Sequence, residues 1–165
     1  MGEEASEREV LDRLERRALE HLMAYGSCAQ SSLKALQDEF GLESAETLKA
    51  ATAMPGVALR GDTCGAVIGP VMALGLAFGR DRPEDTQALM LTLQLASRFC
   101  RSFEEELGSC SCAGVQERLF GRSFNLTDPQ QIQEFAAAGA AERCGVPVAA
   151  AVRIAGRLIM EARRQ

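Results

Sequence analysis

Apolar residues recur at helical spacing along most of the chain, separated by short breaks that contain glycine or proline. Residues 1–24 show this clearly, because acidic and basic residues flank a single apolar face made of Val10, Leu14, Ala18 and Leu22. No stretch has the alternation typical of a half-buried strand. The pattern predicts an all-α fold, a single-domain helical bundle of about six to eight helices over residues 1–165, with 1–24 as an N-terminal amphipathic helix.

Residues that favour helix starts stand at several of the breaks. Ser27 is expected to cap a helix that begins near Cys28. Asp128, followed by proline, gives the strongest start signal in the chain. Asp62 or Thr63 is expected to cap a helix that begins at Cys64.

The segment from Thr63 to Gly79 carries no charge, which raises the question of a membrane span. Its length is at the lower limit for crossing a bilayer, and its glycines and Pro70 reduce its apolar content. We therefore expect a largely buried helix that kinks or restarts at Pro70, and no membrane insertion. The longest helix is expected further on, with Pro83 near its start.

Composition argues against several classes of function. The formal net charge of −5, the absence of tryptophan and the single tyrosine do not favour nucleic-acid binding. No phosphate-binding glycine loop and no hydrolase or transferase motif is present, so electron transfer is the only enzymatic chemistry indicated. The first ten residues have neither a basic region nor an apolar run, and a cytoplasmic location is expected.

The chain has six cysteines, at positions 28, 64, 100, 110, 112 and 144. In a reducing compartment, repeated cysteines point to metal binding or redox chemistry rather than to structural disulfides. Cys28, Cys64 and Cys112 each fall in the first turn of an expected helix, where the helix dipole lowers the pKa of a thiol. Cys144 falls at the junction of the last two helices, and Cys100 is expected to be an ordinary core residue.

Four segments resemble the C_GCAxxG_C_C family of redox-active proteins, and they occur in the family's order. They are "SCAQSSLKALQDEFG", "TCGAVIGPVMALGLAFG", "ELGSCSCAGVQERLFG" and "AERCGVPVAAAVRIAGRLI". The central motif, CGAxxG, corresponds to Cys64, Gly65, Ala66 and Gly69. The resemblance runs from about Tyr25 to Glu161.

The resemblance implies a small bacterial or archaeal protein with four characteristic cysteines. Here these would be Cys28, Cys64, Cys112 and Cys144, with Cys110 as the alternative to Cys112. A related domain forms the C-terminal part of split-Soret cytochromes, where the cysteines are proposed iron–sulfur ligands. Gly65, Ala66 and Gly69 would then lie beside the cofactor. Pro70 departs from the family pattern, which has a small residue at that place.

These residues lead to several hypotheses about function. The leading hypothesis is a redox protein whose four cysteines bind an iron–sulfur cluster for electron transfer. The same cysteines could instead cycle between dithiol and disulfide without a metal, or hold zinc. A non-catalytic helical binding protein is the remaining alternative. A redox partner protein of unknown identity is expected, and the small residues at Gly65, Gly69 and Gly75 suggest a homodimer.

Overall fold

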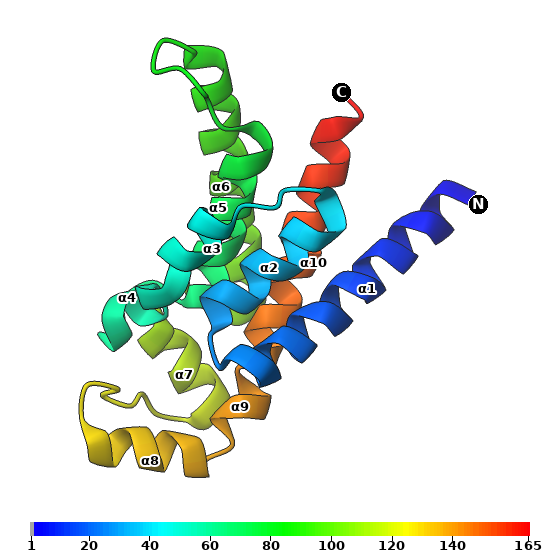
Figure 1. Cartoon of the computed structure of the whole chain (residues 1–165). Coiled ribbons are helices and arrows are strands. Elements are labelled where there is room, and N and C mark those ends of the chain that lie inside the picture. The colour runs from blue at the N-terminus through cyan, green and yellow to red at the C-terminus, as the bar shows by residue number, and fades with distance from the viewer. Residues whose placement is uncertain (1) are drawn as a thin grey trace.

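The chain folds into helices, and no strand occurs in the residues that the structure describes. The structure is a computed structural model that describes residues 2–165, with side chains described from Ser6 onward. Eight helices span six residues or more, which confirms the predicted all-α bundle. The elements, shown in Figure 1, are α1 (Gly2–Tyr25), α2 (Cys28–Phe40), α3 (Ala45–Ala50), the 3-10 turn η1 (Ala51–Ala53), α4 (Gly56–Leu59), α5 (Gly65–Phe78), α6 (Thr86–Leu107), α7 (Cys112–Phe120), α8 (Pro129–Ala137), α9 (Ala140–Arg143) and α10 (Gly145–Arg163).

Helix α10 is the centre of the bundle. It packs against α1, α2, α5 and α6, and α1 and α10 run side by side in opposite directions (Figure 1). Its apolar positions meet the apolar faces of those helices in a continuous core, whose fully buried members include Leu14, Leu33, Leu36, Leu74, Phe99, Phe103, Val148, Val152 and Ile159. Burial of these large side chains is the main source of stability for the fold.

Helices α2 and α5 approach each other closely at two glycines. A Cβ atom on Gly69 would lie 2.4 Å from the carbonyl oxygen of Ala29 and 3.0 Å from the amide nitrogen of Leu33. On Gly65 it would lie 2.8 Å from the amide nitrogen of Ala29. Only glycine allows backbones to come so near, so these two positions serve a contact within the chain rather than the contact between copies that the sequence suggested.

Helix α5 continues through Pro70 as a single helix, and the expected restart does not occur. Proline removes only one backbone donor, and the turns on both sides remain packed against α2 and α10. None of the helices described is both long and apolar enough to cross a membrane.

Helix α6 begins three residues later than the sequence suggested. Asp85 is the N-cap, and its side chain accepts the N–H of Ala88 at 2.9 Å, so Pro83 lies in the preceding turn. The outer parts of α5 and α6 project beyond the rest of the bundle (Figure 1). Met90 and Leu93 on this part of α6 are more than half exposed.

Candidate redox site

Cys28 occupies the first position of α2. Ser27 caps this helix as predicted, because its Oγ accepts the N–H of Gln30 at 3.3 Å. Gly26 has a φ of 63°, which lets the chain reverse direction between α1 and α2. The Cys28 side chain is therefore held at the N-terminus of a well-capped helix, and it is partly exposed.

Cys64 is the N-cap residue of α5, which begins at Gly65. The prediction that Asp62 or Thr63 caps this helix is wrong, since no side chain caps it. The reason is tertiary: the N–H of Cys64 donates to the carbonyl oxygen of Cys110 at 2.9 Å, and Thr63 pairs with Ser111 in an isolated bridge. These contacts hold the segment extended until the helix starts, and Cys64 itself is buried.

The thiols of Cys28 and Cys64 lie close enough for each to act on the pKa of the other. Interaction with Cys64 lowers the pKa of Cys28 and outweighs the opposite effect of burial, and the backbone N–H groups of Gly65 and Ala29 lower it further. The same interaction, together with burial, raises the pKa of Cys64 well above its ordinary value. A Cβ on Gly65 would lie only 2.4 Å from the Cys28 sulfur, so this glycine makes room for the thiol. The arrangement favours a thiolate at Cys28 and a protonated donor at Cys64.

Cys112 is the first residue of α7, which Ser111 caps by accepting the N–H of Gly114 at 3.0 Å. A buried amide, Gln116, donates from Nε2 to the Cys112 sulfur at 3.2 Å. The N–H of Phe124 donates to Oε1 of the same side chain at 2.7 Å, which fixes the orientation of the amide. Gln116 lowers the pKa of Cys112, but burial is the larger effect and the net shift is upward.

Sequence reasoning did not single out Gln116. The available signal was its position four residues after Cys112, which places both side chains on one face of α7. That spacing alone does not distinguish a thiol-binding amide from a surface glutamine. The bond from Phe124, which lies beyond the end of the helix, makes the distinction.

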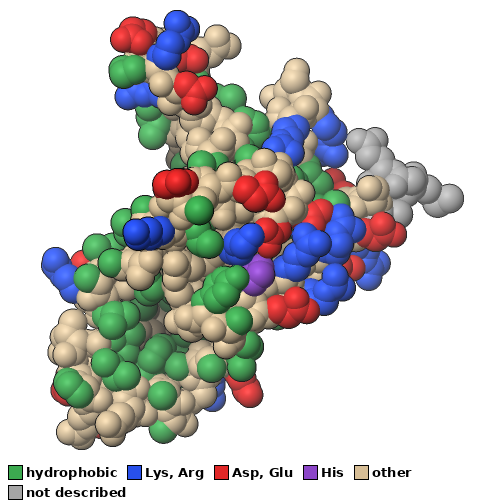
Figure 2. Space-filling model, in the orientation of Figure 1, with side chains coloured by type: hydrophobic (Ala, Val, Ile, Leu, Met, Phe, Trp, Pro, Cys, Tyr) green, Lys and Arg blue, Asp and Glu red, His purple; other side chains and the backbone are tan. Residues whose placement is uncertain are grey.

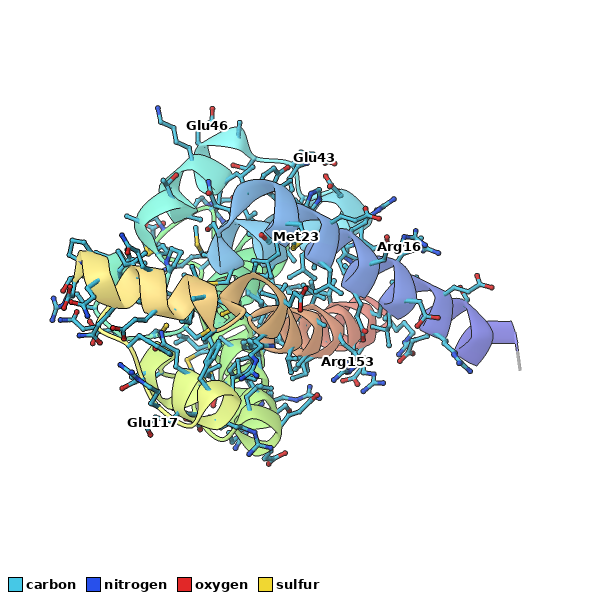
Figure 3. All side chains as sticks on the ribbon, turned by 90° about the horizontal axis from the view of Figure 1, so that it is seen from below. Arg16, Met23, Glu43, Glu46, Glu117 and Arg153 are labelled. Atoms are coloured by element: carbon cyan, nitrogen blue, oxygen red, sulfur yellow. The ribbon has the colours of Figure 1, made fainter. Side chains whose placement is uncertain are left out.

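Cys144 lies at the junction of α9 and α10, as predicted. Burial raises its pKa to about 12, and the charges of Cys28 and Cys112 raise it in the same direction. Cys112 likewise acts on Cys64. Four cysteines from the starts of α2, α5, α7 and α10 thus share one region at the lower end of the bundle in Figure 1. Figure 3 shows this end from below, with α8 lying across it.

The remaining two cysteines form a separate group. The Cys110 thiol donates to the carbonyl oxygen of Cys100 at 3.6 Å. Burial raises the pKa of Cys110 to about 12, with Cys100 and Glu104 adding to the shift. The main causes of the shifts in both residues are burial, the other member of the pair and Glu104. Of the two cysteines that the sequence could not separate, Cys112 therefore neighbours Cys28, and Cys110 neighbours Cys100.

The four-cysteine region does not form a ready metal site. Among the residues whose side chains are described, no group of three or more His, Cys, Asp or Glu is arranged to hold a metal ion. An iron–sulfur cluster or a structural zinc needs four thiolates directed at one point.

The wall of this region next to Cys112 has an unusual backbone. Gly56, Val57, Ala58 and Leu59, which make up α4, have φ values between 46° and 63°, a left-handed turn. A Cβ on Gly56 would lie 3.5 Å from the Cys112 sulfur. Non-glycine residues in this conformation each cost about 1–2 kcal/mol, so tertiary contacts must hold the turn in place.

A pocket of about 480 Å³ opens between this turn and the first turn of α2, where Ser27 and Gln30 line it; Cys28 itself does not. Ala58 and Leu59 form its opposite side. Figure 2 shows hydrophobic side chains around a hollow in the surface between α4 and α8.

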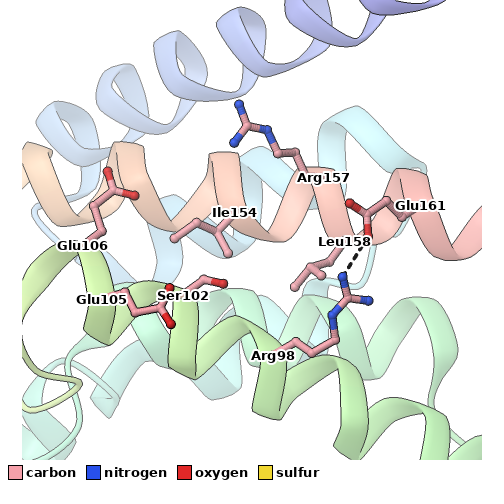
Figure 4. Close-up of a pocket in the computed structure, with 8 residues that line it drawn as sticks. All are labelled: Arg98, Ser102, Glu105, Glu106, Ile154, Arg157, Leu158 and Glu161. Carbon is pink, nitrogen blue, oxygen red and sulfur yellow. Dashed lines mark hydrogen bonds and ion pairs between the residues drawn. The ribbon is translucent and has the colours of Figure 1, made fainter.

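Another groove, of about 460 Å³, lies between α6 and α10 away from these cysteines (Figure 4). An ion pair at 2.9 Å between Arg98 and Glu161 crosses it. It contains no cysteine and mixes both signs of charge, so it offers no redox chemistry; its lining residues are Arg98, Ser102, Glu105, Glu106, Ile154, Arg157, Leu158 and Glu161.

Comparison with known proteins gives one family. The model of the family described as "Putative redox-active protein (C_GCAxxG_C_C)" matches residues 26–158, which is most of the chain and includes all six cysteines. No curated protein and no solved structure gives a significant match.

Proposed function

The chain belongs to the C_GCAxxG_C_C family of redox-active proteins, and from that premise we propose that it is a thiol–disulfide redox protein whose reacting pair is Cys28 and Cys64. The observation that carries the proposal is the position of the Cys28 sulfur, which lies against Gly65 next to Cys64; there Cys64 and two backbone N–H groups lower the pKa of Cys28. A nucleophilic cysteine requires a lowered pKa, and a resolving cysteine must lie beside it.

The reaction would follow in two exchanges. The Cys28 thiolate attacks one sulfur of a disulfide on the partner, forms a mixed disulfide and releases the other sulfur as a thiolate, which takes up a proton. Cys64 then loses its proton and attacks the Cys28 sulfur, which closes a Cys28–Cys64 disulfide and releases the second partner thiol. The partner disulfide gains two electrons, and the two cysteines of this chain lose them.

The neighbouring thiols have a supporting role in this scheme. The pKa values of Cys112 and Cys144 are raised, so both are protonated and uncharged at neutral pH. A neutral thiol does not repel the Cys28 thiolate, whereas a second thiolate in the same buried region would. Gln116 holds Cys112 in position through its amide.

An iron–sulfur cluster on Cys28, Cys64, Cys112 and Cys144 is the second candidate, favoured by the convergence of four helix starts on one region. A cluster bound there would supply one-electron transfer. The thiols as described do not have the geometry of a metal site, so they would have to move to hold it.

Disulfide mapping tests the proposal, because trypsin places Cys28 and Cys64 in different peptides, 18–34 and 61–80. The protein is purified without oxygen, assayed for iron, sulfide and zinc, and equilibrated in glutathione buffers of increasing oxidised fraction. Acid quenching, alkylation and digestion should reveal the two peptides joined by a disulfide. In Cys64→Ser, Cys28 should carry glutathione instead.

Cys144→Ser is the matched control, since it removes a neighbouring thiol and should leave the Cys28–Cys64 disulfide intact. Free thiols in both peptides at the most oxidising ratio would refute the proposal. Purified protein with bound iron and sulfide, in which Cys28 and Cys64 resist alkylation until the iron is removed, would favour the cluster instead.

A further inference from the structure

Cys100 and Cys110 form a close pair outside the four-cysteine region. The Cys110 thiol donates to the backbone oxygen of Cys100 at 3.6 Å, and each of the two thiols affects the pKa of the other. Both side chains are partly exposed, whereas Cys64 is buried. Cys100 packs against the core as its position on α6 suggested, but it is only partly buried there.

The local backbone holds the two residues together. Helix α6 ends at Leu107, and Gly108, with a φ of 81°, turns the chain back so that Cys110 returns toward Cys100. The carbonyl oxygen of Cys110 accepts the N–H of Cys64, which anchors the returning loop to the start of α5. The pairing of the two thiols thus results from fixed backbone on both sides and not from flexible side chains alone.

We propose that Cys100 and Cys110 form a second dithiol–disulfide couple, which exchanges with low-molecular-weight disulfides independently of Cys28 and Cys64. The spacing of ten residues makes the loop that such a disulfide closes short, and the loop is already closed in the reduced protein. The family motif uses other cysteines, so this couple is an additional site of this chain.

The exchange consumes one molecule of a small disulfide such as oxidised glutathione. One of the two cysteines, as a thiolate, attacks a sulfur of glutathione disulfide and releases one glutathione. The other cysteine, after losing its proton, attacks the protein sulfur of the mixed disulfide and releases the second glutathione. The protein loses two electrons, and the glutathione disulfide gains them.

The carboxylate of Glu104, one helical turn after Cys100, affects how fast this exchange runs. Burial is the main cause of the raised pKa of both cysteines, and the Glu104 carboxylate raises both further, so the exchange should be slow at neutral pH. The equilibrium between dithiol and disulfide does not depend on that rate. The test therefore reads the populations after they have stopped changing.

Trypsin again separates the two residues, into peptides 99–101 and 102–118. The whole protein is equilibrated in glutathione buffers, quenched in acid, alkylated and digested, and the two peptides are sought as a disulfide-linked species. Fragmentation of that species identifies which of Cys110 and Cys112 is bonded. We expect a Cys100–Cys110 bond that exceeds the mixed glutathione disulfides, because paired thiols in a fixed loop have an effective concentration on the order of millimolar or higher.

Two variants keep the result interpretable. Cys28→Ser should leave the Cys100–Cys110 bond unchanged, which separates this couple from the proposed redox pair. Cys110→Ser should leave Cys100 with glutathione alone. The proposal is wrong if Cys100 and Cys110 stay free at the most oxidising ratio, or if Cys110 is bonded to Cys112 or Cys64 instead.

Discussion

Replacement of Gly69 by alanine tests how α2 and α5 are held together. The added Cβ would lie 2.4 Å from the carbonyl oxygen of Ala29, where ordinary contact begins near 3.4 Å. The obstacle is backbone, so it cannot move away by a change of rotamer. The two helices must separate by about 1 Å at this point to restore normal van der Waals distance.

The expected cost follows from two opposing effects. Overpacking of a well-packed interior costs about 1–3 kcal/mol, occasionally more. An alanine in a helix interior is favoured over glycine by about 0.8–1.0 kcal/mol, which offsets part of that cost. Because the clash is with main-chain atoms, we expect the cost to prevail, with a net loss of about 1–2 kcal/mol in the free energy of unfolding.

Gly75→Ala is the matched control, because it lies on the same helix and its Cβ would meet no atom within 4 Å. It should stabilise the protein by about 0.5–1 kcal/mol. Urea unfolding followed by circular dichroism under reducing conditions measures both variants. With a slope of about 2 kcal/mol per molar urea, Gly69→Ala should lower the midpoint by roughly 0.5–1 M. Equal or greater stability of Gly69→Ala relative to the unmodified protein would refute the close approach of the helices.

Three further predictions concern the thiols. Alkylation by iodoacetamide followed by peptide analysis measures the reactivity of the cysteine in each, and urea unfolding measures the stability in the third. Because only the thiolate reacts, Cys28 should reach its half-maximal alkylation rate at a lower pH than an ordinary cysteine. Cys144 should stay unreactive until the pH approaches about 12. The same dependence of rate on pH for both cysteines would contradict this. Cys64→Ala should move the Cys28 midpoint to higher pH, since the largest cause of its lowered pKa is removed; an unchanged midpoint would mean that the backbone N–H groups suffice. Gln116→Leu should slow the alkylation of Cys112, because the sulfur loses its amide donor. It should also cost about 1–3 kcal/mol of stability, because the buried N–H of Phe124 loses its acceptor. A faster reaction with unchanged stability would count against the role of the amide.

Local features of the chain could be predicted from sequence. The helices, and the caps at Ser27 and Asp128, depend on residues within a few positions of each other, and the structure confirms them. The start of α5 was predicted wrongly, because the backbone around Cys64 is held by Cys110, which lies far along the chain. Sequence patterns do not contain such contacts.

The candidate site also combines features that the sequence predicts with features that only the packing of helices determines. The family motif pointed to the cysteines of the candidate site, but Cys110 and Cys112 are two residues apart and equally plausible from sequence. In the structure the start of α7 directs one toward Gln116 and the return of the loop directs the other toward Cys100. The pairing of thiols, and the amide that accompanies one of them, depend on how separate helices pack.

Because the four-cysteine region is built from four helix starts, it can assemble only in a fixed order during translation. Cys28, Cys64 and Cys112 leave the ribosome before Cys144, and α10, the helix on which the others pack, comes last. At ~5–20 residues per second, the 32 residues from Cys112 to Cys144 take roughly two to six seconds. During that time the earlier thiols lack their final shelter, so a nascent chain is open to unwanted oxidation that the finished fold resists.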